Sequence, residues 1–490
     1  MIEGGSIRPA RPMTEFASAG GATALPPAAP RQEHVLRGAK AAALVASLTL
    51  AVLSYQLNAT MITPVLPQIA TDLGESLDHV AGVSSLFFLA GGIAGIVLSR
   101  WSDFIGRKLC LMILLVILIT GTLLCIVAPN LPVLLTGRVM QGCSSAAFQI
   151  AYLLLRERLQ KKLFGVSLGL ITAISGGAGG IDGYLGGLLA GRFGFRAVFV
   201  AILIFGLLAL LSAMLHLPRD APVDRGGRMG SRMDWAGAAA LSLMLACTSF
   251  FVSDGAAIGW GSARTLAWLG GAASAFAAFW QIERRSAAPL VATHHLRSRS
   301  FWPMLMTTSL TLAGIFAVIN FTIVLLSQDQ RAGFGLDSAT SALLYLSPAA
   351  LIGVLTAPMA GWLADRLGWI RVMRLGLGAS ILLLIAIALR SDDPGFVMVA
   401  VALLGLTYNG LALTTLNGLG VLLSPKDAPA ALPGLNGAAF GLGANLGIAI
   451  VAPFAAAGTG AGYATALCIS CGITLAAFIS SLFIAQEPGA

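Results

Sequence analysis

The chain has 490 residues, of which 57% are hydrophobic and only 10% are charged. This balance is too apolar for a soluble domain to bury in one core, so most of the chain must have lipid as its solvent. The formal net charge of +9 could suggest nucleic acid, but the basic residues gather at the ends of apolar segments. We therefore expect a lipid bilayer as the partner, and no nucleic acid.

Residues 1–40 are rich in Ala, Pro and Gly and carry five basic residues. They lack the short apolar stretch of a cleavable signal peptide. This composition is typical of a segment that cannot bury a core. We predict a disordered cytoplasmic tail.

Apolar runs of about 20 residues, enough for a helix to cross roughly 30 Å of hydrocarbon, recur along the chain after residue 40. The runs are continuously apolar rather than alternating, which favours helices over a β-barrel, and a helix satisfies its own backbone in lipid. We predict an all-α membrane protein with fourteen spans. They are 41–66, 78–99, 109–128, 131–155, 163–190, 197–217, 235–254, 264–282, 301–327, 338–364, 372–389, 394–423, 432–457 and 462–484.

The basic residues predict the orientation of these spans. If the N-terminus is inside, most of the 30 lysine and arginine residues fall on the inner side, and the first outer loop is acidic. An excess of basic residues marks the cytoplasmic side of a membrane protein. We therefore predict a multi-pass protein of the cytoplasmic (inner) membrane, with both termini in the cytoplasm.

The six cysteines lie inside or at the edge of predicted spans, and no disulfide framework follows from them. Cys468 and Cys471 have the CxxC spacing of metal and redox sites, but no histidine is near them, so we interpret both as packing residues. The five histidines fall in the tail, in loops or at span ends. We expect no metal and no cofactor.

An internal repeat divides the chain. The segment WSDFIGRK, residues 101–108, resembles GWLADRLG, residues 361–368, and each joins two predicted spans on the inner side. The copies are farther apart than six spans require, and the surplus matches the spans 235–254 and 264–282. We predict a six-helix bundle over 41–217, a linker with two extra spans over 218–300, and a second six-helix bundle over 301–485.

These motifs carry a resemblance to a known family. Residues Gly361, Leu363, Asp365, Arg366 and Gly368 match the loop signature G-x-L-x-D-R-x-G of the major facilitator superfamily. Its first copy is matched by Asp103, Gly106, Arg107 and Lys108, and its fourth-helix signature R-x-x-Q-G by Arg138, Gln141 and Gly142. The chain resembles in particular the fourteen-helix drug:proton antiporters. The resemblance implies two six-helix bundles around a midplane site, acting as a monomer.

Two charged residues stand out within the spans, Arg138 in span 131–155 and Asp182 in span 163–190. An ionisable group at membrane depth is costly unless it is paired or faces water, so it is a candidate functional residue. Both lie at similar depth, roughly 10–12 Å below the outer surface at 1.5 Å per residue. We predict that they face one another or share the central cavity, with Asp182 titrating and Arg138 as its partner. A static buried ion pair is the alternative.

Neutral polar residues within the spans are candidates for lining the substrate cavity. Each could equally form a hydrogen bond between helices, because such bonds are common in membrane proteins. The predicted cavity residues are Gln56, Asn58, Gln141, Asn320 and Asn409. The resemblance singles out Asn58 and Gln141.

The two loop motifs are interpreted as conformational latches, because carboxylates at helix ends can cap helices and pair with arginine across the two halves. A basic loop that only sets orientation is the alternative. The predicted latch residues are Asp103, Arg107, Lys108, Gly361, Asp365, Arg366 and Gly368.

Together these features predict a secondary active transporter that exports amphipathic small molecules by proton-coupled alternating access. The alternative is an importer or facilitator of an organic anion that Arg138 would bind. A membrane-embedded enzyme is not expected, because the loops are too short and too poor in His, Asp and Glu to build a catalytic cluster.

Overall fold

A computed structural model shows how the chain folds. The structure describes residues 36–62, 65–75, 77–80, 82–219, 233–286, 289, 298, 301–336, 338–425, 428–455 and 457–484. Of the predicted tail over 1–40, residues 1–35 lie outside these ranges. These ranges are helices and their connections, and no strand occurs in them.

The helices of the first half of the chain are joined by short connections. We call α1 to α9 the first half. Its elements are α1 (Gly38–Thr60), α2 (Leu66–Leu73), α3 (Leu77–Val80), α4 (Gly82–Ile105), α5 (Arg107–Val127), α6 (Leu131–Gly142), the 3-10 turn η2 (Cys143–Ser145), α7 (Ala146–Arg158), α8 (Lys161–Phe193) and α9 (Arg196–His216).

Two helices follow, α10 (Trp235–Ile258) and α11 (Ala263–Arg285), and α13 to α21 then form the second half. Four stretches of this half are π-helical. Its elements are α13 (Trp302–Thr311), η3 (Leu312–Phe316), η4 (Val318–Thr322), α14 (Ile323–Gln328), α15 (Ser338–Ser341), η5 (Ala342–Leu346), α16 (Ser347–Leu367), α17 (Trp369–Leu389), α18 (Pro394–Leu404), η6 (Gly405–Leu413), α19 (Thr414–Leu422), α20 (Ala431–Ala455) and α21 (Gly460–Leu482).

Eleven helical segments of the described chain are long and apolar enough to cross a membrane. Three predicted spans are helical but are not among these eleven segments. They are 131–155, 163–190 and 264–282. The first of them is divided by the turn η2 into helices of 12 and 13 residues. An all-helical membrane protein is therefore confirmed, and the number fourteen stays a prediction.

Local sequence signals fix several helix ends. Asn130 accepts a hydrogen bond from the backbone N–H of Val133 at 3.2 Å and so caps α6. Asp393 caps α18 in the same way, directly before a proline in the first turn. A side-chain oxygen at this position satisfies a backbone N–H that has no partner in the helix.

The two copies of the loop motif form the same turn. Gly106, between α4 and α5, has φ 99°, and Gly368, between α16 and α17, has φ 94°. Residues with a side chain rarely adopt these angles, so glycine is required at both positions. The motif end of the helices, which we define by Asp103 and Asp365 at these two turns, is therefore built alike in both halves.

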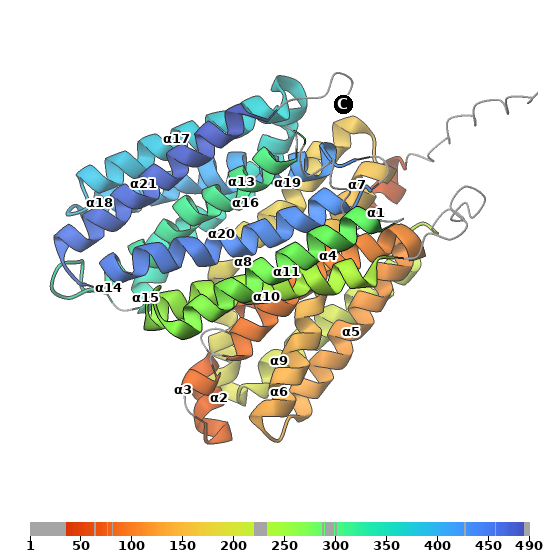
Figure 1. Ribbon diagram of the computed structural model, residues 1–490, viewed down its shortest axis with the longest axis horizontal. Helices are drawn as coiled ribbons and strands as arrows, with labels where there is room; N and C mark the ends of the chain where they lie inside the picture. The colour runs from red at the N-terminus through yellow and green to blue at the C-terminus, as the bar shows by residue number, and fades with distance from the viewer. Residues whose placement is uncertain are drawn as a thin grey trace, which may run out of the picture. The chain divides into compact units, whose positions relative to one another are not determined.

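The two halves pack through a few helix pairs. In the part of the chain from residue 36 onward, α8 packs along α16, and α4 along α20. Helices α10 and α11 lie side by side, and α10 contacts both α4 and α20, as Figure 1 shows at the front of the view. Helix α10 thus bridges the two halves.

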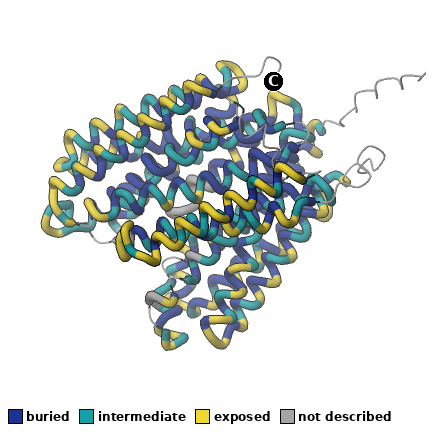
Figure 2. The backbone as a smooth tube through the Cα atoms, in the orientation of Figure 1, coloured by how far each residue is buried: buried dark blue, intermediate teal, exposed yellow. Residues whose placement is uncertain are grey.

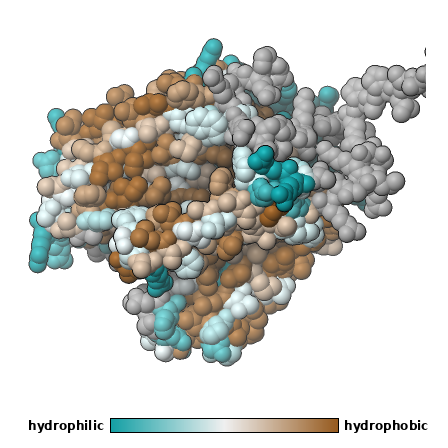
Figure 3. All heavy atoms as spheres, viewed as in Figure 1, coloured by the Kyte–Doolittle hydropathy of each residue, from teal (hydrophilic) through white to brown (hydrophobic). Residues whose placement is uncertain are grey.

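The exposed surface has the polarity expected of a protein in lipid. Buried residues form the interior of the packed helices, and exposed positions follow their outer faces (Figure 2). Large apolar side chains such as Leu382 and Leu389 are among the most exposed. On the face in Figure 3, hydrophobic residues cover much of the described helices and hydrophilic ones gather near helix ends. Such a surface would be unstable in water but suits a bilayer.

Candidate transport site

Arg138 on α6 is fully buried and ties three helices together. Its Nε donates a hydrogen bond to the carbonyl oxygen of Val83 at 2.9 Å, and its Nη1 donates to Gln141 Oε1 at 2.8 Å. Nη1 also lies 3.2 Å from the carbonyl oxygen of Asn58, and the guanidinium stands over the Phe87 ring at 4.2 Å. Charge-assisted hydrogen bonds and a cation–π contact offset the cost of burying this charge.

Two predicted cavity residues belong to the same network. Gln141 accepts from Arg138 and donates from its Nε2 to Thr122 Oγ1 on α5 at 2.9 Å. Asn58 donates from its Nδ2 to the carbonyl oxygen of Ser54 at 3.1 Å. Both side chains are fully buried. In this conformation both side chains form hydrogen bonds between and within helices. Their contact with a substrate stays a prediction.

Asp182 on α8 is 3% exposed and accepts a hydrogen bond from Thr60 Oγ1 near the end of α1. Thr60 lies two residues after Asn58, which contacts Arg138. Asp182 and Arg138 therefore both reach the same end of α1. Their direct pairing stays a prediction.

The other predicted cavity residues lie apart from this network. Gln56 is buried within α1. Asn320 is exposed on the π-helical segment η4 and donates to the carbonyl oxygen of Phe316, while Asn409 lies half-buried on η6 and reaches Ala349. π-Helical segments inside helices are frequent at functional sites. The π-helical conformation at Asn320 and Asn409 leaves no signal in the sequence.

Aromatic side chains form a row beside this region, which the sequence analysis missed. The Tyr55 ring of α1 meets the Phe148 ring of α7 edge to face at 5.9 Å, and Phe148 lies 6.1 Å from the Tyr152 ring. Tyr55 also stacks on Phe87 at 5.3 Å. We call Tyr55, Phe148 and Tyr152 the aromatic row.

The aromatic row ends where the two halves meet. Tyr152 Oη lies 3.3 Å from Thr172 Oγ1 on α8, and Asn417 of α19 donates to the same oxygen at 3.4 Å. One turn further along α7, Arg156 donates to the carbonyl oxygen of Val421, also on α19. This face of α7 therefore touches the second half.

A helical period in the sequence could have revealed this face. Ser145, Gln149, Tyr152 and Arg156 are polar residues spaced by three or four positions, which places them on one side of a helix. Gln149 is buried against Gly437 of α20. The shared face of these four residues depends on their spacing along the helix, so no single polar residue reveals it.

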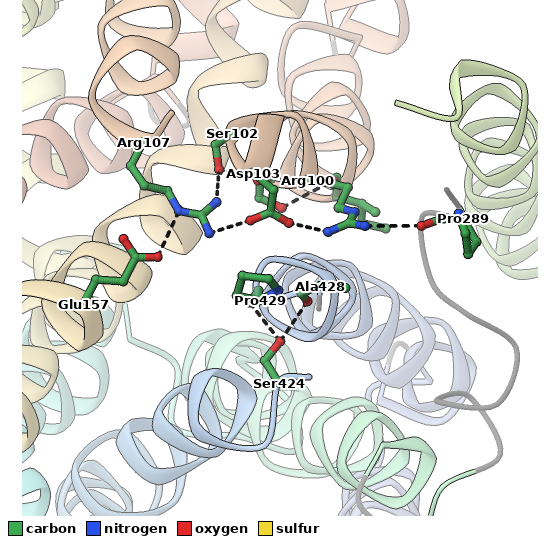
Figure 4. A network of polar contacts seen from close by, with 11 residues as sticks. Arg100, Ser102, Asp103, Arg107, Glu157, Pro289, Ser424, Ala428 and Pro429 are labelled. Carbon is green, nitrogen blue, oxygen red and sulfur yellow. Dashed lines mark hydrogen bonds and ion pairs between the residues drawn. The ribbon is translucent and has the colours of Figure 1, made fainter. Parts of the chain in front are cut away.

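At the motif end, Asp103 lies between two arginines, as Figure 4 shows. Its carboxylate oxygens are 2.5 Å from Arg100 Nη1 and 2.5 Å from Arg107 Nη2. Arg107 also donates to Ser102 Oγ and lies 3.3 Å from Glu157 on α7. These partners all lie in the first half, so the first motif copy joins α4, α5 and α7.

Other basic residues of this copy hold neighbouring segments. Lys108 Nζ donates to the carbonyl oxygens of Met214 and Leu217 at the end of α9, at 3.1 and 2.7 Å. Arg100 Nη2 donates to the carbonyl oxygen of Pro289, which follows α11 (Figure 4). The first copy thus also connects the first half to the linker.

The second motif copy is arranged differently. Gly361 packs against the backbone of Gly165 in the first half, and the Asp365 carboxylate lies close to Gly165 as well. Arg366 stands over the Trp362 ring of its own helix at 4.0 Å. The contact between the halves therefore passes through Gly361 and Asp365, and the latch role of either copy stays a prediction.

Long apolar helices in two packed halves define this chain as a polytopic α-helical membrane protein. Residues 48–448 match the family model of the Major Facilitator Superfamily. The chain belongs to this superfamily, and it is a transporter rather than an enzyme. The superfamily predicted from the loop motifs is therefore confirmed.

Individual relatives differ in what their names say they transport. The uridine/deoxyuridine transporter of Lactococcus lactis is 32% identical over 462 residues, which cover 90% of this chain and 94% of that protein. The multidrug resistance protein Stp of Mycobacterium tuberculosis is 25% identical over 82% of this chain and 73% of its own length. The human organic anion transporter MFSD10 has a similar fold, with a TM-score of 0.63 at 15% identity over 91% of this chain and all of that one.

Proposed function

We propose that this protein is a proton-coupled secondary transporter that moves uncharged nucleosides by alternating access. One observation carries this proposal. The face of α7 at the meeting of the two halves combines aromatic rings with neutral amide and hydroxyl groups. The nearly full-length similarity to a protein named as a uridine/deoxyuridine transporter supports the same substrate class.

The aromatic row suits a planar base. Tyr55 and Phe148 are partly exposed, and Tyr152 ends the row at the contact between the halves. Aromatic side chains bind a flat heterocycle through stacked or edge-to-face contacts and add a polar hydroxyl at one end. Base–aromatic stacking is worth about 1–3 kcal/mol per base in proteins that bind single-stranded nucleic acids.

The amide and hydroxyl groups near the row suit a sugar and a base without charge. Gln149 Oε1 has no hydrogen-bond partner among the described residues, and Thr172 and Asn417, which bond to one another, are likewise uncharged hydrogen-bonding groups. A polar, neutral substrate needs groups of this kind, because each of its buried polar atoms must find a partner.

The organic-anion alternative has less support. Arg138 is fully buried, and its Nε and Nη1 already donate to Val83, Asn58 and Gln141. Nη2 alone of these donors has no partner among the described residues, so an anion would meet a single nitrogen donor rather than the paired donors of a bidentate arginine contact. We therefore assign Arg138 a positioning role for α1, α4 and α6.

Export of amphipathic compounds is the second candidate, favoured by the similarity to Stp over 82% of the chain. In either case we propose Asp182 as the proton-carrying group, because a buried carboxylate can gain and lose a proton whereas Arg138 cannot usefully do so. Its contact with Thr60 would couple protonation to the end of α1.

Counterflow in proteoliposomes separates the two candidates. Vesicles loaded with unlabelled uridine should accumulate external labelled uridine through the wild-type protein, and vesicles loaded with a lipophilic cation should not. Exchange of the lipophilic cation without exchange of uridine would favour the export of amphipathic compounds and contradict nucleoside transport.

A further inference from the structure

The Gln149 amide occupies a confined place between the two halves. The residue is 9% exposed, and its Nε2 lies near Gly95 of α4 on one side and against Gly437 of α20 on the other. The two glycines come from different halves of the protein. The amide is therefore a point at which both halves could sense a bound molecule.

One polar atom of this amide is unsatisfied. Gln149 Oε1 is buried and has no hydrogen-bond partner among the described residues. A buried carbonyl oxygen without a partner costs free energy, so native proteins rarely leave one unused. Phe148 and Tyr152, whose rings are 6.1 Å apart, lie one position before and three positions after Gln149 on the same helix.

We propose that Gln149 is a specificity-determining residue that binds the imide edge of a pyrimidine base, accepting a hydrogen bond from its N3–H. The inference rests on the nucleoside transport proposed for this protein. The oxygen of a carboxamide accepts a hydrogen bond and the N3–H of an imide donates one, so Gln149 Oε1 and this edge of the base are complementary.

The contact of Nε2 with Gly437 gives this complementarity a direction. With Nε2 held at the glycine, Oε1 is the atom left to meet the base. Uracil and thymine present N3–H there, whereas the N3 of cytosine is an acceptor that would face another acceptor. A site that hydrogen-bonds a substrate N–H strongly rejects an analogue that lacks it.

The structure offers a test that leaves Gln149 itself unchanged. A Cβ added at Gly437 would meet only the Gln149 amide, while a Cβ added at Gly441, one turn further along α20, would meet nothing within 4 Å. Gly437→Ala should therefore displace the amide, and Gly441→Ala is its matched control.

The experiment measures inhibition of labelled uridine transport in proteoliposomes by unlabelled uridine, cytidine and 3-methyluridine. Wild type and Gly441→Ala should prefer uridine to 3-methyluridine by about tenfold or more, which is the usual effect of one lost buried hydrogen bond. Gln149→Leu and Gly437→Ala should reduce this preference to about twofold or less, through weaker uridine binding.

The possible failures are distinguishable. If the wild type transports uridine and Gln149→Leu keeps the full preference over 3-methyluridine, the assignment of Gln149 is overturned while nucleoside transport stands. If Gly441→Ala loses the preference as completely as Gly437→Ala, the contact with Gly437 does not orient the amide. The proposed orientation of Oε1 toward the base is then overturned. If the folded wild type neither binds nor transports uridine, the proposed function and this inference both fall.

Discussion

Gly165 of α8 and Gly361 of α16 meet backbone to backbone, so that neither position has room for a side chain. They belong to different halves of the protein, and the same face continues at Gly169, which packs on Ala357. Close approach of two helices in a membrane depends on small residues of this kind. This contact joins the two halves at the motif end.

The first prediction follows from this contact. Gly361→Ala should keep α8 and α16 apart and shift the protein toward a conformation open at the motif end, with transport slowed about tenfold or more. Gly187→Ala on α8, where an added Cβ would meet nothing within 4 Å, should transport at the wild-type rate. Labelling of a cysteine introduced near residue 361 would report the opening, and unchanged labelling with full transport would contradict the prediction.

The second prediction concerns the two motif copies. The Asp103 side chain is 6% exposed and lies between Arg100 and Arg107, whereas Asp365 is exposed. Removing one partner of a buried ion pair leaves an uncompensated charge and typically costs about 3–5 kcal/mol, while exposed pairs are worth about 0–1 kcal/mol. Asp103→Asn should therefore lower the thermal unfolding midpoint in detergent much more than Asp365→Asn. Equal shifts would mean that the ion pairs at Asp103 do not stabilise the fold.

The third prediction is a dependence of stability on pH. Asp329, in the loop after α14, accepts hydrogen bonds from the backbone N–H of Arg331 and from Tyr463 Oη, at 2.8 and 2.9 Å. These bonds hold the pKa of the Asp329 carboxyl below its usual range. Its contribution to stability is thus present above the unfolded pKa, about 3.9, and is lost as the pH falls through the lower folded value.

Thermal unfolding of wild type and Asp329→Asn between pH 3 and pH 7 checks this sign. The wild type should be the more stable at neutral pH, and the difference should shrink as the pH falls below about 4. A difference that grows on acidification would show that the carboxylate is not stabilised in the folded protein.

The sequence predicted those features that depend on local pattern. The glycines at positions 106 and 368 could be assigned to matching turns because the loop motif repeats, and Asp182 could be expected to be buried because it lies within an apolar run. The turn inside the predicted span 131–155 was missed, since Cys143, Ser144 and Ser145 are neither proline nor a recognisable break.

Contacts between distant segments could not be predicted in this way. That Thr60 donates to Asp182, or that Gly437 lies against Gln149, depends on how helices far apart in the chain pack. Hydrophobic periodicity indicates that a helix has a buried face but not which helix covers it. The aromatic row was missed for the same reason, because Tyr55 and Phe148 come from separate helices.

Proton-coupled nucleoside transport is tested by the uptake of labelled uridine into proteoliposomes under an imposed pH gradient, with wild type and Asp182→Asn compared at matched amounts of folded protein. A gradient should drive uridine accumulation in the wild type, and Asp182→Asn should abolish this accumulation while still exchanging uridine in counterflow. Wild-type uridine movement that ignores the pH gradient, or undiminished gradient-driven accumulation by Asp182→Asn, would contradict proton coupling through Asp182.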